Sequence, residues 1–210
     1  MGHVVIARDG AADGRRMALR DRHLAVITPM AADGRLALGV PLFAADGRVH
    51  GSLMVLQTDR AGLDAYLAEE PFAAEGVWAA VEIHPFRIAP LPYRPLPGPD
   101  APLPSRVTHT VLIARDAPGS RRDAVRDAHL RRVRPLAEAG LLVLGGAILD
   151  APEGRMTGSV AVTAHPTEAE ARAFWAEDPY LREGVWGETA WFGTRFAPLP
   201  YRPLPGGSGA

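Results

Sequence analysis

The apolar residues in the first half of the chain follow two different periods, which predict an order of strands and helices. Short apolar runs rich in β-branched residues are typical of strands, and apolar positions that recur every three or four residues are typical of an amphipathic helix. An Asp-Gly pair at Asp46 and Gly47 lies between two of the runs and predicts a hairpin. The predicted elements are strand 4–8, helix 14–32, strands 36–43 and 51–57, helix 61–69 and strand 79–88.

The second half of the chain repeats the first. Residues 3–9 return almost unchanged at 109–116, and residues 89–98 return letter for letter at 197–206. Such self-similarity indicates two copies of one folding unit. The second copy predicts strand 110–115, helix 121–139, strands 141–149 and 158–163, helix 168–177 and strand 187–196. The order strand, helix, strand, strand, helix, strand is the ferredoxin-like arrangement, so the predicted fold class is α+β.

A histidine interrupts the apolar face of the long helix in each copy. A buried imidazole needs hydrogen-bond partners for its ring nitrogens. Each copy also has an acid at the end of its next helix, Glu70 in the first and Asp178 in the second. We therefore expect His23 to meet Glu70, and His129 to meet Asp178. The two helical faces are Leu19, His23, Ile27 and Met30 in the first copy and Val125, His129, Val133 and Leu136 in the second.

The pairing of a histidine with an acid fits two roles. A carboxylate on one ring nitrogen fixes the tautomer and makes the other nitrogen a better base, which is the arrangement of a general acid–base catalyst. The same spacing also fits a core histidine that is bonded to a backbone carbonyl group. The sequence pattern alone leaves both roles open.

Two arginines and two serines are candidates for ligand contacts. Arg20 and Arg126 precede the histidines by one helical turn, where a guanidinium group could bind a carboxylate or an enolate oxygen. A surface arginine paired with a nearby acid fits the same pattern. Ser52 and Ser159 follow glycines near the start of a predicted strand, so they fit turn residues first and ligand contacts second.

Two tryptophans are further candidates. Trp78 and Trp186 occupy corresponding positions at the start of the last strand of each copy. Aromatic side chains at such positions usually belong to the core. They would also suit the wall of a pocket for a flat, unsaturated ligand.

The composition excludes several kinds of chemistry. The chain has no cysteine and no lysine, which excludes a thiolate nucleophile, Cys-ligated zinc and a Schiff base. A formal net charge of −1 offers no surplus of positive charge for nucleic acid. No apolar run approaches the ~20 residues that cross a bilayer, and no signal-peptide pattern is present. We expect a cytoplasmic protein without a nucleic-acid or membrane partner.

Metal and cofactor motifs are also missing from the sequence. No pair of histidines has the spacing of metal ligands on a helix, and no glycine-rich dinucleotide or phosphate motif occurs. We therefore expect neither a metal nor a cofactor.

A proline-rich segment follows each copy. The first segment joins the copies and the second ends the chain, and both are expected to form stiff polyproline II straps. One hypothesis is that Tyr93-Arg94 and Tyr201-Arg202 anchor the straps onto a barrel. The alternative is an ordered tail that covers a sheet edge. Residues 206–210 are expected to be flexible.

These motifs together resemble the YCII-related (YciI-like) family. They are the Arg-x-x-His-Leu helix at 126–130, Asp-Pro-Tyr at 178–180 and Gly-Val-Trp at 184–186. The resemblance implies ferredoxin-like units that pair into a dimeric α+β barrel. Two fused copies then imply a pseudo-dimeric barrel in one chain, either monomeric or paired again as a homodimer. The expected domains are repeat 1 (1–89), a strap (90–106), repeat 2 (107–197) and a second strap with the tail (198–210).

The resemblance also implies a catalytic His–Asp dyad, and some family members are dehydrochlorinases of hydroxymuconate-like substrates. Transferred to this chain, the dyad is His129 with Asp178, and the family's tyrosine is Tyr180. Repeat 1 departs from the pattern with Glu70 and with Phe72 in place of the tyrosine. Repeat 2 is therefore the expected catalytic half.

Two functions remain open from the sequence. The first is a cofactor-independent lyase or isomerase that acts by elimination, isomerisation or ring opening on a small unsaturated or aromatic carbonyl compound. His129 and Asp178 would be catalytic, with ligand contacts from Arg126, Arg20, Tyr180, Ser159, Trp186 and Trp78. The alternative is a barrel that binds or senses a small molecule without turnover.

Overall fold

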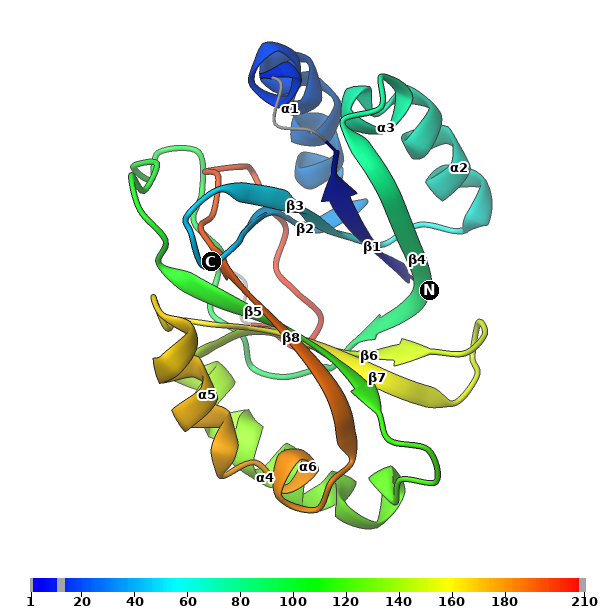
Figure 1. Cartoon of the computed structure of the whole chain (residues 1–210), viewed down its shortest axis with the longest axis vertical. Coiled ribbons are helices and arrows are strands. Elements are labelled where there is room, and N and C mark those ends of the chain that lie inside the picture. The colour runs from blue at the N-terminus through cyan, green and yellow to red at the C-terminus, as the bar shows by residue number, and fades with distance from the viewer. Residues whose placement is uncertain (1, 11–13, 208–210) are drawn as a thin grey trace.

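Both repeats have the predicted order of strands and long helices. The structure is a computed structural model and describes residues 2–10 and 14–207. Figure 1 shows the ribbon in chain order. Repeat 1 contains β1 (Gly2–Asp9), α1 (Arg15–Asp33), β2 (Leu36–Phe43), β3 (Val49–Leu56), α2 (Arg60–Glu69), α3 (Pro71–Ala74) and β4 (Trp78–Ile88).

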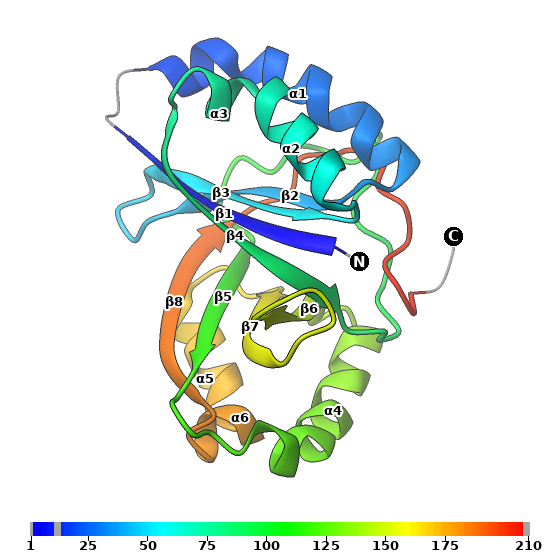
Figure 2. The same ribbon diagram turned by 90° about the vertical axis from the view of Figure 1, so that its right-hand side faces the viewer.

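Repeat 2 follows the same plan, and the two repeats together form one closed barrel. The strands run in the order β1-β3-β2-β8-β5-β7-β6-β4. The helices of repeat 1 cover one side of the barrel and those of repeat 2 the opposite side (Figure 2). The predicted pseudo-dimeric α+β barrel is confirmed. The elements of repeat 2 are β5 (His109–Asp116), α4 (Arg122–Glu138), β6 (Leu142–Leu149), β7 (Met156–Thr163), α5 (Glu168–Ala176), α6 (Pro179–Arg182) and β8 (Trp186–Thr194).

The alternation of side chains along the strands creates two apolar layers. Val4 and Ile6 of β1 belong to the cluster that fills the barrel, whereas Val5 and Ala7 belong to the cluster beneath the helices of repeat 1. Successive side chains of a strand point to opposite faces of the sheet, so each strand supplies both layers. The sheet is therefore apolar on both faces, and each repeat keeps a separate space between its long helix and the sheet.

The two seams between the repeats differ. At one seam β4 pairs with β6 through three residue pairs, Phe86 to Ile88 with Gly146 to Ile148. At the other seam β2 and β8 share one pair, Phe43 with Gly193. Pro41 of β2 lies at the position that corresponds to Ala147 of β6, and proline has no N–H group for the ladder. Thr194 partly compensates for this missing ladder bond, since its hydroxyl group donates to the Pro41 carbonyl oxygen at 2.6 Å.

The sequence did not predict the two short helices α3 and α6. Pro71 and Pro179 end the preceding helices as expected, but each also occupies the first turn of a new one. Proline suits this position because its N–H group would have no intrahelical partner there. The residues before the prolines, Glu70 and Asp178, are the N-caps of these helices. The acids are thus fixed in place by the local backbone.

The anchoring of the straps is confirmed, and each strap anchors on the repeat that it does not follow. The Tyr93 hydroxyl group donates to the Gly145 carbonyl oxygen at 2.9 Å and accepts from the Gly145 N–H group at 3.1 Å. Tyr201 makes the same two bonds with Gly39. Arg94 and Arg202 donate to carbonyl groups at the ends of α4 and α1. The straps therefore tie the two repeats together.

The end of the second strap is also ordered in part. Gly207 donates its N–H group to the Leu204 carbonyl oxygen at 2.8 Å, which closes a turn. The remainder of the tail that was expected to be flexible, 208–210, lies outside the described residues. Within the described part of the chain, no helix is long and apolar enough to cross a membrane.

Removal of the tyrosine hydroxyl groups of the straps tests whether the straps hold the two repeats together. Tyr93→Phe and Tyr201→Phe should each lower the free energy of unfolding by about 1–3 kcal/mol, because a buried backbone N–H group loses its partner. Urea denaturation of both variants measures this. If the free energy of unfolding changed by less than about 0.5 kcal/mol in both variants, as in ordinary surface substitutions, the straps would not hold the repeats together.

Candidate active site

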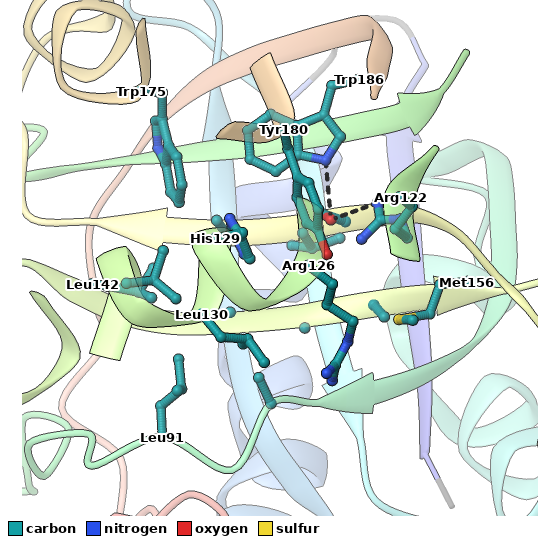
Figure 3. Close-up of a pocket in the computed structure, with 18 residues that line it drawn as sticks. Leu91, Arg122, Arg126, His129, Leu130, Leu142, Met156, Trp175, Tyr180 and Trp186 are labelled. Atoms are coloured by element: carbon teal, nitrogen blue, oxygen red, sulfur yellow. Dashed lines mark hydrogen bonds between the residues drawn. The ribbon is translucent and has the colours of Figure 1, made fainter. Parts of the chain in front are cut away.

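A cavity of about 60 Å³ lies between α4 and the sheet of repeat 2 (Figure 3). The α4 side of the cavity carries Arg126 and His129, and the sheet contributes Ser159. The first strap closes it with Leu91, a residue that follows repeat 1 in the chain. The other lining residues are Ala89, Arg122, Leu130, Val133, Leu142, Gly145, Gly146, Ala147, Met156, Val160, Ala161, Trp175, Tyr180 and Trp186.

His129 and Asp178 are in direct contact at this cavity. The His129 Nδ1 atom lies 2.8 Å and 3.0 Å from the two carboxylate oxygens of Asp178. The carboxylate is fully buried, and its Oδ1 atom also accepts the backbone N–H group of Tyr180 at 2.9 Å. A carboxylate can only accept hydrogen bonds, so Nδ1 must carry the proton. The Nε2 atom then holds a lone pair and has no hydrogen-bond partner among the described residues.

Aromatic rings fix the plane of the imidazole. Tyr180 stacks on His129 at a centroid distance of 4.0 Å with an interplanar angle of 15°. Trp186 meets the imidazole edge-on at 6.0 Å, and Trp175 lies 6.4 Å away in a stacked orientation. These contacts hold the ring in one orientation toward the cavity.

Arg132 gives the buried carboxylate a second charged neighbour. Its Nη1 atom lies 3.6 Å from the Oδ2 atom of Asp178, and its Nη2 atom donates to the Phe174 carbonyl oxygen. The arginine also lies over the Phe174 ring, 4.9 Å from the centroid. The guanidinium group thus offsets part of the charge of the buried carboxylate.

A second polar group on the cavity wall was missed by the sequence reasoning. Arg122 forms two 2.6 Å hydrogen bonds with Asp116 and a third, of 3.1 Å, to the Ser159 hydroxyl group. The signal was present in the repeat, because Asp9 and Arg16 correspond to Asp116 and Arg122 and pair in the same way. Only the fold shows that the end of one strand meets the start of the next helix.

Two hydrogen-bond donors fix the orientation of the Ser159 hydroxyl group. It accepts from Arg122 and also from the Trp186 indole N–H group at 3.2 Å (Figure 3). Arginine and tryptophan can only donate, so both lone pairs of the oxygen are in use. The hydroxyl proton of Ser159 is therefore free to donate to a ligand in the cavity.

Arg126 is a cation without an ion-pair partner in the described part of the chain. It is half-buried and lines the cavity with His129. Burial raises the pKa of Tyr180, while the charges on Arg122 and Arg126 act in the opposite direction. Asp116 offsets the charge of Arg122, and none of the described lining residues is acidic, so Arg126 makes the cavity wall positively charged.

Repeat 1 has the corresponding arrangement with differences. The His23 Nδ1 atom lies 2.7 Å from one Glu70 oxygen, while the other oxygen is buried and without a hydrogen bond. Phe72 stacks on His23 at 4.3 Å, where repeat 2 has a tyrosine. Arg16 donates to Ser52 at 2.7 Å. The adjacent cavity, of about 380 Å³, is larger than that of repeat 2.

The structure brings together most of the candidate residues of each repeat. Arg126, Tyr180, Ser159 and Trp186 line the cavity of repeat 2 with His129, and Arg20 lines that of repeat 1 with His23. Trp78 is the exception. It packs edge-on against Phe72 at 6.1 Å and is not among the residues that line the cavity of repeat 1, so a ligand contact from Trp78 stays a prediction. No group of three metal-ligating side chains occurs among the residues described.

Comparison with known proteins identifies the repeat at the level of sequence. A profile of the YCII-related domain matches residues 1–87 and, a second time, residues 108–192. These two ranges contain every strand and helix of the barrel except the last residues of β4 and β8. No curated protein sequence matches the chain.

Solved structures share the barrel at low sequence identity. A heme-binding protein from Thermus thermophilus is 11% identical, with 94% of this chain and 92% of that chain covered and a TM-score of 0.57. An anthrone oxidase-like protein is 14% identical, with coverages of 93% and 90% and a TM-score of 0.52. The dehydrochlorinase TftG from Burkholderia phenoliruptrix AC1100, solved with 2,5-dihydroxybenzoquinone, is 20% identical over 42% of this chain and 96% of its own, with a TM-score of 0.39. The similarity to the heme-binding protein and to the anthrone oxidase-like protein shows the fold alone.

The two serines provide a matched test of the hydrogen-bond network. Ser159→Ala leaves the buried Trp186 N–H group without an acceptor and should cost about 1–3 kcal/mol of unfolding free energy. Ser52→Ala should cost less, because the Trp78 N–H group already lacks a partner. Urea denaturation of the two variants gives the difference. Equal losses in both would contradict the assigned network.

Proposed function

The chain belongs to the YCII-related domain family, and on this premise we propose that repeat 2 is a cofactor-independent acid–base catalyst. One observation carries the proposal. The fully buried Asp178 binds His129 Nδ1 and leaves Nε2 unpaired in a cavity whose walls are cationic and aromatic. A neutral imidazole with this tautomer is a base at Nε2.

The proposed reaction begins when His129 Nε2 removes a proton from a carbon atom next to a carbonyl group. The electron pair of the broken C–H bond moves to the carbonyl oxygen and forms an enolate. Arg126 and the free hydroxyl proton of Ser159 then stabilise the negative oxygen. The imidazolium, held by Asp178, returns its proton either to a different carbon atom or to a leaving group. In the second case the carbonyl group re-forms, the electron pair of the enolate makes a new C=C bond, and the bond between carbon and the leaving group breaks. The first outcome is an isomerisation, and the second is an elimination or a ring opening.

The shape and charge of the cavity support a particular class of substrate. The space is small, and three aromatic side chains surround the imidazole. A flat, unsaturated or aromatic carbonyl compound can stack against such walls. The unpaired Arg126 favours a substrate that carries a carboxylate or forms an enolate. We propose a small unsaturated keto acid or a hydroxylated aromatic intermediate.

Deuterium exchange tests the proposed proton abstraction. Small unsaturated keto acids in D₂O should exchange their α-protons in the presence of the protein, as followed by proton NMR. His129→Gln should slow this exchange by roughly 10²–10⁴-fold because it removes the base. His23→Gln in repeat 1 is the matched control and should retain most of the activity.

The outcome separates catalysis from simple binding. Melting curves by circular dichroism establish that both variants remain folded. If the keto acids bind but no exchange occurs with the unmodified protein, the acid–base proposal fails and a binding barrel remains. Equal exchange by His129→Gln and the unmodified protein would also contradict it.

A further inference from the structure

We infer that the cavity of repeat 1 is a second binding site, specific for an amphipathic organic anion. The site lies between α1 and the sheet of repeat 1. The helices of repeat 1 and those of repeat 2 lie on opposite sides of the barrel (Figure 2). The ligand would have one negatively charged head group and an apolar body. This inference concerns binding alone and does not depend on catalysis in repeat 2.

The mouth of the cavity is apolar and exposed to solvent. Of the large hydrophobic side chains that are exposed in the described part of the chain, Met17 (70%), Leu103 (50%) and Val49 (37%) all line this cavity. The position corresponding to Met17 in repeat 2 is Asp123, so this apolar residue of the rim is particular to repeat 1. Clusters of exposed apolar side chains around a cavity are typical of ligand sites.

The interior of the cavity carries positive charge. Arg16, Arg20 and Arg195 line it, and no acidic residue does so among those described. Asp9 neutralises Arg16 through a close ion pair. The carboxylate nearest to Arg20 is the highly exposed Asp21, 3.7 Å away. Two guanidinium groups thus remain available for an anion.

Arg195 is the second available cation, and it comes from beyond repeat 1. Its Nη1 atom donates to the Pro104 carbonyl oxygen at 3.0 Å, and its guanidinium group lies 5.3 Å from the centre of the Phe43 ring. No carboxylate pairs with it in the described part of the chain. Leu103, from the linker, stands beside it on the cavity wall. The site is therefore completed by the fusion of the two repeats.

The loose seam of the barrel explains why this cavity is the larger one. Pro41 and Phe43, which lie at the seam with a single β2–β8 pair, are both lining residues. The tighter β4–β6 seam borders the cavity of repeat 2. The difference, about 380 Å³ against about 60 Å³, gives repeat 1 room for a larger ligand. Pockets of roughly 300–1,000 Å³ suit drug-sized molecules.

The polar groups of repeat 1 favour binding over the chemistry proposed for repeat 2. Phe72 replaces the phenol of Tyr180, so no hydroxyl group stands at this position. The buried Glu70 uses only one oxygen to hold His23. His23 and Ser52 also line the cavity, and the main recognition elements are two cations and an apolar wall. A single carboxylate or sulfonate on an apolar skeleton satisfies both.

Two fluorescent probes that differ in one charge test the site. The probe 1-anilinonaphthalene-8-sulfonate carries a sulfonate, and N-phenyl-1-naphthylamine has the same rings without it. Arg20→Gln should weaken binding of the sulfonate probe about tenfold, in line with the loss of one charged hydrogen bond, and leave the neutral probe unchanged. Met17→Asp, which introduces the residue of repeat 2, should weaken both probes.

Three results would overturn the inference. If Arg126→Gln in repeat 2 abolishes binding while the repeat 1 variants do not, the probe occupies the other cavity. If Arg20→Gln affects both probes equally, the arginine does not recognise the anion. If Met17→Asp changes the mass in sedimentation without changing probe affinity, the apolar rim is a contact between two copies of the chain. Deuterium exchange by repeat 2 is a separate readout, so either proposal can fail alone.

Discussion

The buried carboxylate of Asp178 is the contact on which the organisation of repeat 2 depends. It caps the short helix α6 through the Tyr180 N–H group and at the same time binds His129 Nδ1. An uncompensated buried charge is costly, so the carboxylate requires these donors and the neighbouring Arg132. The requirement determines the tautomer of His129, and Tyr180, which follows the cap, then stacks on the same ring. The hydrogen bonds that the buried carboxylate requires thus leave only the Nε2 atom of His129 available for chemistry.

Duplication allowed the two halves of the barrel to diverge. Both keep an acid at a helix cap and a histidine beside it, but repeat 1 has Glu70 and Phe72 where repeat 2 has Asp178 and Tyr180. The straps couple the halves, because each closes or supports the cavity of the other repeat. Leu91 follows repeat 1 and lines the cavity of repeat 2, and Ala197, at the end of repeat 2, lines the cavity of repeat 1. Separate cavities in one rigid barrel can thus acquire different ligands.

The sequence predicted the strands, the four longer helices and both His–acid contacts, because these follow from periodicity and from the repeat. It did not reveal the caps of α3 and α6, since a cap depends on backbone direction after a proline. The pair Asp116–Arg122 was also missed, because it joins a strand end to a helix start across a loop. Trp78 and Trp186 occupy the same position in the pattern, yet only Trp186 lines a cavity. Cavity size and access depend on packing at the seams, which local patterns do not encode.

The tautomer of His129 is the most direct test of this account. Nitrogen-15 NMR distinguishes a protonated from an unprotonated imidazole nitrogen. The signals that are missing from the spectrum of His129→Gln belong to His129, and Asp178→Asn tests whether the acid determines the tautomer. The account predicts a neutral ring whose proton lies on Nδ1 and whose Nε2 is unprotonated. A ring with its proton on Nε2, or an equal mixture of tautomers that Asp178→Asn does not change, would contradict it.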